Sequence, residues 1–220
     1  MTDFVPDDDT QTVAPTGFSS PELQHLLASG TGKSSKRSAE LLGLAPLPSM
    51  EETVLVGGAA LLVRGQLSIL DDIDVVPKDA ALDVGYALTN ALRWMVLKGA
   101  SDGTSQLCLY VESDKAAVYA RPGELGTWWF TILDPAIGSE QVVAATVMSM
   151  AHVAEDSAVI VRDISAAGDH TFSIQRRGKD WGYAHGKSDA ATPETLVEDA
   201  DPDAMLNDLT LFITRFTETR

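Results

Sequence analysis

The chain has 220 residues, of which 45% are hydrophobic and 22% are charged, and its formal net charge is -16 at pH 7. The composition is that of an ordinary globular protein, and the length allows one large domain or two small ones. The negative charge repels phosphate backbones and anionic lipid, which argues against nucleic acid or a membrane as partner. The charge favours a basic or apolar protein partner, or else it serves solubility alone.

Apolar runs such as residues 57–63 fall short of the about 20 residues that a membrane-spanning helix needs. Acidic residues stand at the N-terminus, where a signal peptide carries basic ones, so we expect a cytoplasmic protein. The single cysteine, Cys108, excludes an internal disulfide and a cysteine-rich zinc site. We expect it to be a small buried residue in a strand.

Residues 1–18 are polar, acidic and proline-containing, and we predict that they form a disordered tail. Residues 19–50 are predicted to be a helical segment. Its first part, S-S-P-E-L-Q-H-L-L-A-S-G, predicts a short helix with Ser20 as N-cap, Pro21 at the first helical position and Gly30 at the end.

The next residues, S-G-T-G-K-S-S-K-R, resemble the end of a phosphate-binding loop, G-x-x-x-x-G-K-[ST]. If Gly32-Lys33-Ser34 closed that motif, position 27 would have to be glycine, and it is Leu27. The spacing therefore argues against the loop. We expect a flexible basic linker through Arg37, followed by one or two helical turns over residues 38–44.

One stretch of the chain reads V-L-V-G-G-A-A-L-L-V-R-G-Q-L-S-I-L-D-D-I-D-V-V. It resembles the nucleotidyltransferase superfamily, in which Gly-Gly follows a strand and opens a helix. The resemblance implies that Gly57 and Gly58 approach the phosphates of a nucleoside triphosphate and that Asp72 and Asp74 bind Mg²⁺. Carboxylates one residue apart on a strand face the same side and can share such ions. Asp134 is the candidate for a third carboxylate.

An internal repeat gives a different interpretation of the same residues. Two segments of the chain can be aligned, and each is followed by a helical pattern. The first segment is T-V-L-V-G-G-A-A-L-L-V-R-G-Q-L-S-I-L-D-D, followed by a helical pattern over residues 80–97. The second is Q-L-C-L-Y-V-E-S-D-K-A-A-V-Y-A-R-P-G-E-L-G-T-W-W-F-T-I-L-D-P, followed by a helical pattern over residues 139–150. The alignment makes residues 61–64 a strand and places Asp72 and Asp74 before a helix, where acids are favoured. Both interpretations stay open.

A third, looser unit contains S-A-V-I-V-R-D, H-T-F-S-I-Q-R-R-G-K-D and W-G-Y-A-H-G, followed by a helix over residues 203–216. Its turns, A-A-G-D and R-G-K-D, are typical of hairpins. Residues 51–220 are therefore predicted to form a single α+β domain. We expect an antiparallel sheet built from repeated hairpin units, each followed by a helix packed on one face.

Two features are candidate partner contacts. Trp128 and Trp129 are adjacent in a predicted strand, so they point to opposite faces, and one of them can lie on an open face of the sheet. The acidic stretch E-T-L-V-E-D-A-D-P-D-A is predicted to be a solvated loop, with Asp201 as helix cap before Pro202, or else a docking surface for a basic segment. Its candidate contact residues are Glu198, Asp199, Asp201 and Asp203.

No catalytic residue is predicted, because the chain has no G-x-S-x-G element and its histidines show no metal-ligand spacing.

The late part of the chain contains R-D…R-R-G-K-D-W-G-Y, followed by D-P-D-A-M-L-N-D-L. Together with the order of elements, this pattern resembles the EspG-type accessory proteins of actinobacterial type VII (ESX) secretion. The resemblance covers residues 50–216 in pattern and implies an acidic cytosolic chaperone that binds secreted effectors. Type III secretion chaperones share this small, acidic, α+β character.

The sequence therefore favours a non-enzymatic protein-binding module without a cofactor, in the role of a secretion-associated chaperone. The alternative is a Mg²⁺-dependent nucleotidyltransferase.

Overall fold

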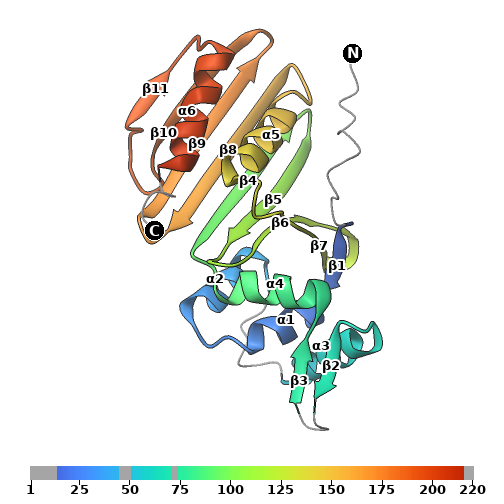
Figure 1. Ribbon diagram of the computed structural model, residues 1–220. Coiled ribbons are helices and arrows are strands. Elements are labelled where there is room, and N and C mark those ends of the chain that lie inside the picture. Colours follow the sequence, from blue (N-terminus) through green and yellow to red (C-terminus); the bar gives the residue numbers. More distant parts are fainter. Residues whose placement is uncertain (1–13, 45–50, 71–73, 216–220) are drawn as a thin grey trace.

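The computed structural model describes residues 14–44, 51–70 and 74–215 (Figure 1). Across these residues, nine strands form one antiparallel sheet in the order β1-β7-β6-β5-β4-β8-β9-β10-β11, which confirms the α+β class. The strands are β1 (Thr16–Ser19), β4 (Arg93–Ser101), β5 (Thr104–Glu112), β6 (Ala117–Pro122), β7 (Thr127–Ile132), β8 (Asp156–Ser165), β9 (Gly168–Arg177), β10 (Asp180–Lys187) and β11 (Thr195–Val197).

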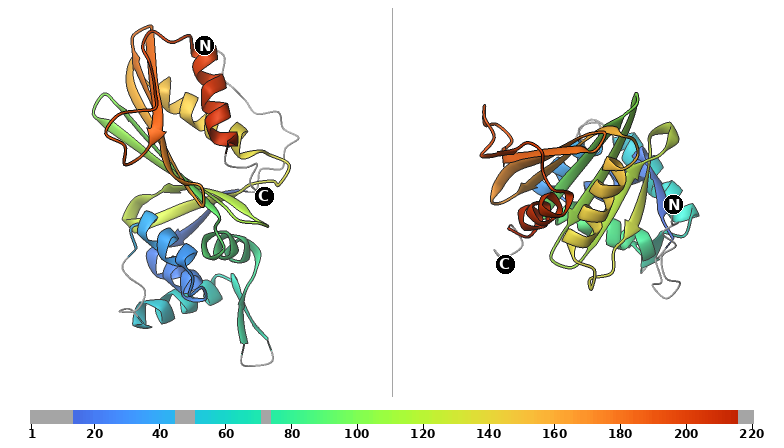
Figure 2. Two further views of the ribbon diagram at one scale, coloured as in Figure 1. Left: turned by 90° about the vertical axis from the view of Figure 1, so that its left-hand side faces the viewer. Right: turned by 90° about the horizontal axis from the view of Figure 1, so that it is seen from above.

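Helices cover both faces of this sheet, so the expectation of helices on one face is wrong (Figures 1 and 2). One core lies under α1 (Ser20–Ala28), α2 (Lys33–Leu41) and α4 (Asp79–Thr89). The other lies under α5 (Ser139–Ala151) and α6 (Pro202–Thr214). Strand β4 serves both cores, because successive side chains of a strand point to opposite faces: Trp94 belongs to the first core and Met95 to the second.

The predicted repeat is confirmed in part. Strands β5 to β7 of the second unit are followed by α5, and strands β8 to β10 of the third unit are followed by α6. Strands β4 and β11 also belong to the sheet and were not predicted. The hairpin turns expected at A-A-G-D and R-G-K-D join β8 to β9 and β9 to β10.

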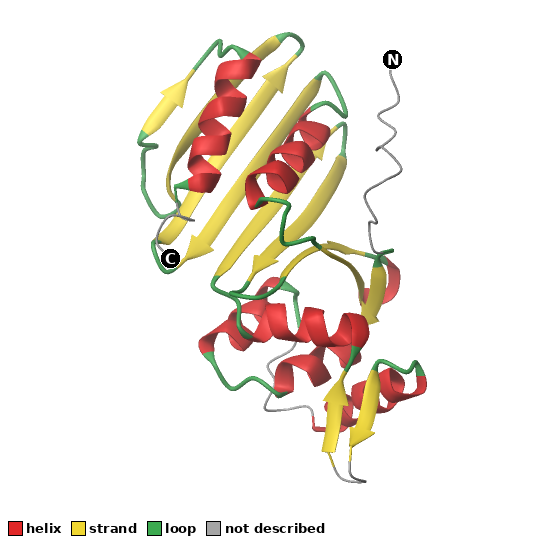
Figure 3. Cartoon of the chain, viewed as in Figure 1, coloured by secondary structure: helices red, strands yellow, loops and turns green. Residues whose placement is uncertain are grey.

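The first unit differs from the prediction. Residues 61–64, expected to be a strand, lie in or directly after helix α3 (Glu51–Val63). The next strands, β2 (Leu67–Leu70) and β3 (Asp74–Pro77), form a two-stranded hairpin separate from the main sheet (Figure 3). A short apolar run fits a strand and a buried helix equally well, so periodicity could not choose between them.

The predicted helix over residues 80–97 is also too long, because α4 ends at Thr89 and Arg93 begins β4. Strand β4 is buried on both faces over its first five residues. Its residues therefore form a continuous apolar run instead of an alternating one, and such a run can be mistaken for the end of a helix.

Near the N-terminus, order begins earlier than the composition suggests. Strand β1 starts within the segment predicted to be a tail, and its Phe18 is fully buried against Phe130 in an edge-to-face contact with ring centroids 5.8 Å apart. The N-cap of α1 is Ser19, one residue before the predicted Ser20. The Glu22 carboxylate accepts hydrogen bonds from both the backbone N and the Oγ of Ser19, at 2.7 and 2.8 Å.

The segment predicted to be a flexible basic linker is helical, because α2 already begins at Lys33. Two of its serines anchor it: Ser34 Oγ donates to the Ala91 carbonyl and Ser38 Oγ donates to the Leu88 carbonyl, at 2.8 and 2.7 Å. Serine-rich composition suggests a linker, but these hydroxyls satisfy backbone carbonyls of another element and fix the helix in place. Within the described residues, no helix is both long enough and apolar enough to cross a membrane.

Candidate functional site

The two adjacent tryptophans lie on opposite faces of the sheet, as predicted from their positions in a strand. The side chain of Trp128 is buried in the first core, with 7% of its surface exposed, and its Nε1 donates to the Leu42 carbonyl at 3.2 Å. Trp129 is 45% exposed. Of the two candidates, Trp129 is therefore the one available to a partner, and Trp128 holds the fold together.

The Trp129 indole packs closely against two glycines. In the β1–β7 register, Trp129 stands opposite Gly17, and a Cβ built on Gly17 would lie 3.3 Å from the ring. A Cβ built on Gly123 would lie 2.7 Å from the indole Nε1. Larger residues at either glycine would push the ring away, so these two positions determine the pose of the exposed aromatic surface.

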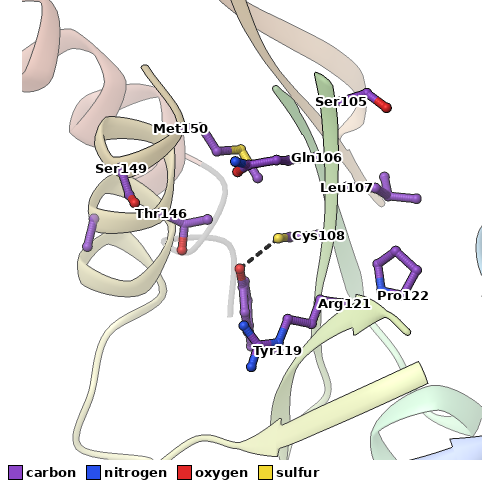
Figure 4. Close-up of a pocket in the computed structure, with 11 residues that line it drawn as sticks. Ser105, Gln106, Leu107, Cys108, Tyr119, Arg121, Pro122, Thr146, Ser149 and Met150 are labelled. Carbon is purple, nitrogen blue, oxygen red and sulfur yellow. Dashed lines mark hydrogen bonds between the residues drawn. The ribbon is translucent and has the colours of Figure 1, made fainter. Parts of the chain in front are cut away.

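A pocket of about 630 Å³ opens on the same face, between α5 and strands β5 and β6 (Figure 4). Arg121 lines this pocket and stands directly opposite Trp129 in the β6–β7 register, so the indole neighbours a residue of the pocket. From the other side, α5 contributes Thr146 and Met150, which Figure 4 shows facing the strands.

The interior of the pocket is electrically neutral. The Tyr119 hydroxyl donates to Cys108 Sγ at 2.7 Å (Figure 4). Burial raises the pKa of the Cys108 thiol, although the hydrogen bond from Tyr119 and the charge of Arg121 partly oppose this. Burial also raises the pKa of Tyr119, and its contact with Cys108 adds to the effect.

Both groups therefore stay protonated at neutral pH, and a thiol in that state is a poor nucleophile. Cys108 is a buried residue of strand β5, as predicted. Among the residues that line the pocket, Arg121 carries the charge. The lining mixes polar and apolar side chains with one cation, so the arrangement can accept a side chain that carries a polar or anionic group.

The glycines of the nucleotidyltransferase interpretation do not stand where the resemblance implies. Gly57 and Gly58 stand in the middle of α3 instead of between a strand and a helix. Asp74 is exposed at the first position of β3, and Asp72 lies outside the described residues. Asp134 belongs to the turn before α5, where its Oδ1 accepts from the backbone N of Ala136 at 2.8 Å.

Among the residues that the structure describes, no three His, Cys, Asp or Glu side chains are grouped so as to hold a metal ion.

A packing requirement explains the two glycines. A Cβ on Gly57 would lie 1.9 Å from the Pro21 carbonyl oxygen, and one on Gly58 would lie 2.6 Å from the His25 ring. The His25 ring in turn hydrogen-bonds the Val54 carbonyl at 3.0 Å. Helices α1 and α3 can approach this closely only because the glycines have no side chain.

The acidic stretch lies far from Trp129. It contains β11, at one edge of the sheet, whereas β7 lies next to β1 at the other edge. The expectation of a loop is therefore wrong for Thr195–Val197. Asp201 is the N-cap of α6, as predicted, and its Oδ1 accepts from the backbone N of Asp203 at 3.3 Å. Glu198 and Asp199 precede this cap, so the structure gives this stretch a helix-capping role and does not join it to the tryptophan surface.

Sequence reasoning missed Arg121 and the pocket. The available signal was the spacing in A-V-Y-A-R-P, which places Tyr119 and Arg121 on one face of a strand. The helix that closes the pocket comes from a later segment and cannot be placed by strand spacing. A scan against protein-family models found no family that matches this chain, and a search of curated proteins found no relative.

Proposed function

We propose that this protein is a non-enzymatic binding module, with a chaperone-like role for a secreted protein, that holds a segment of its partner against Trp129 and the adjoining pocket. The observation that carries the proposal is the exposed indole of Trp129, which packs against Gly17 and Gly123.

An exposed tryptophan in a fixed pose suits protein recognition. Tryptophan is among the residues that contribute most to binding energy at protein interfaces. A ring that is already held by the sheet loses little conformational freedom when a partner covers it, so less of the interaction energy is spent on ordering.

The pocket supplies the second part of the proposed site. Its volume of about 630 Å³ has room for a large side chain between Tyr119 and α5. Arg121 in its lining favours an acidic side chain or a terminal carboxylate on the bound segment. The pattern resemblance to EspG-type proteins supports a secreted substrate as the source of that segment.

The test compares Trp129→Ala with Ile160→Ala, because Ile160 is also 45% exposed and belongs to β8, away from the pocket. Overlapping peptides from secreted proteins of the same genome are screened for binding to the wild-type protein, and the affinities of bound peptides are measured by fluorescence anisotropy. We expect Trp129→Ala to weaken binding by about ten-fold or more and Ile160→Ala to leave it unchanged.

Unchanged affinity in Trp129→Ala, with the fold verified by circular dichroism, would contradict the proposal. Trp128→Ala is a poor probe of binding, because the buried Trp128 side chain supports the first core and its loss is expected to destabilise the fold.

A further inference from the structure

The outer surface of α3 and of the β2–β3 hairpin is unusually apolar. Seven of the fifteen large apolar side chains that are exposed in the described part of the chain lie on these elements. Four of them are on α3: Leu55, Val56, Leu62 and Val63, exposed by 72, 60, 41 and 88%. We call this surface the outer face of α3.

The spacing of these residues is that of a helix-packing surface. Leu55, Ala59 and Leu62 follow one another at intervals of four and three residues, as in the seam between two packed helices. The opposite side of α3, with Gly57 and Gly58, is already packed on α1. The helix therefore has two faces suited to helix packing, and within the described residues one of them is covered.

The segments around the outer face are acidic. Residues 51–70 and 74–83 contain five acidic and two basic residues. One of the basic residues, Arg64, is already engaged, because its guanidinium donates to Glu22 Oε1 at 2.6 Å and to the Gly17 carbonyl at 3.0 Å. Glu51 and Asp74 are exposed at the starts of α3 and β3.

We infer that the outer face of α3 docks an amphipathic helix of a protein partner that carries lysine or arginine beside its apolar stripe. The apolar stripe covers Leu55 and Leu62, and the basic residues complement the acidic segments around the outer face. A second copy of this chain is less suited, because it brings another net charge of -16. An anionic lipid surface is repelled for the same reason.

This site is independent of Trp129, which lies on the sheet face covered by α5, whereas α3 packs on α1 below the opposite face (Figures 1 and 2). Failure of one proposal therefore leaves the other standing.

The test uses a labelled synthetic helix of about 18 residues, with leucines at the core heptad positions and lysines beside them. One control peptide is a scrambled sequence of the same composition, and another has glutamate in place of each lysine. We expect the wild-type protein to bind the leucine–lysine helix about ten-fold or more tightly than either control, as measured by fluorescence anisotropy.

The Leu55→Ser/Leu62→Ser variant is expected to lose about ten-fold or more of this affinity. Leu211→Ser is the matched control, since Leu211 is exposed to a similar degree on α6, and Trp129→Ala is the control for the other site. Both are expected to bind as the wild type does. If the scrambled peptide or the double variant binds equally well, the inference is overturned.

Sedimentation equilibrium adds an independent outcome. If the wild-type protein forms a dimer that the double variant abolishes, a second copy occupies the outer face and the inference is wrong. Circular dichroism verifies that the double variant folds; if it does not, Val63→Ser replaces it, because that side chain is almost fully exposed.

Discussion

The buried ion pair between Arg93 and Asp163 illustrates what a single residue contributes to this fold. The two side chains are 5% and 1% exposed, and Arg93 Nε donates to Asp163 Oδ1 at 3.0 Å. The same guanidinium also donates to the carbonyl of Ile213, at the end of α6, at 2.6 Å. The pair therefore joins β4, β8 and α6 in a place that excludes water, where either charge alone would be costly.

We expect Asp163→Asn to lower the free energy of unfolding by about 3 kcal/mol or more, because it leaves the buried charge of Arg93 without its counter-charge. Urea unfolding followed by circular dichroism measures the change. The control is Asp169→Asn, which breaks the exposed pair with Arg162 and is expected to cost about 1 kcal/mol or less. Equal losses in the two variants would show that burial of the pair has no energetic consequence.

At the scale of an element, α3 shows how a small-residue face determines a helix position. Its apolar residues are spread around the whole helix, so its orientation is not set by an amphipathic pattern. The glycine pair sets it instead, by allowing the backbone of α1 to come close at Pro21. This contact also holds Arg64 where it can reach the Gly17 carbonyl of strand β1.

Gly57→Ala is expected to reduce the free energy of unfolding by about 1–3 kcal/mol, because the added Cβ forces α1 and α3 apart. Alanine's higher helix propensity alone would predict a gain of up to about 1 kcal/mol, so the sign of the change separates the two effects. Gly85→Ala serves as the control, since Gly85 also lies inside a helix and a Cβ there would come no closer than 3.6 Å to Leu26, an ordinary van der Waals contact. Thermal and urea unfolding measure both variants; a more stable Gly57→Ala protein would contradict the packing argument.

At the scale of the whole molecule, one sheet is shared by two cores that are offset along it. The N-terminal helices cover the strands from β4 towards β1 on one face, and α5 and α6 cover the strands from β6 towards β10 on the other. Because each set of helices covers only part of its face, an open surface is left beside α5. Trp129 and Arg121 lie on that surface.

We expect the melting temperature of the protein to stay unchanged when Mg²⁺ and each of the four nucleoside triphosphates are added. A ligand that binds only the native state must raise the apparent stability, so thermal unfolding detects it without knowledge of the reaction. A rise with any nucleotide that Asp74→Ala removes would instead support the nucleotidyltransferase alternative.

Local sequence pattern was enough for elements whose signals lie within a few residues. The helix after residue 138, the hairpins of β8 to β10, the Asp201 cap of α6 and the opposite directions of Trp128 and Trp129 all follow from periodicity, turn residues or strand geometry. These features depend on neighbouring residues along the chain, which is why one sequence suffices to predict them.

The remaining features depend on contacts between distant segments. Whether residues 51–63 form a helix or a strand was decided by the close packing of Gly57 on α1, and which tryptophan is exposed was decided by the helices that cover each face. The pocket beside Arg121 exists because α5 returns over β5 and β6 from a later part of the chain. Such contacts are made only when the chain folds back on itself, and no short stretch of the sequence carries a signal for them.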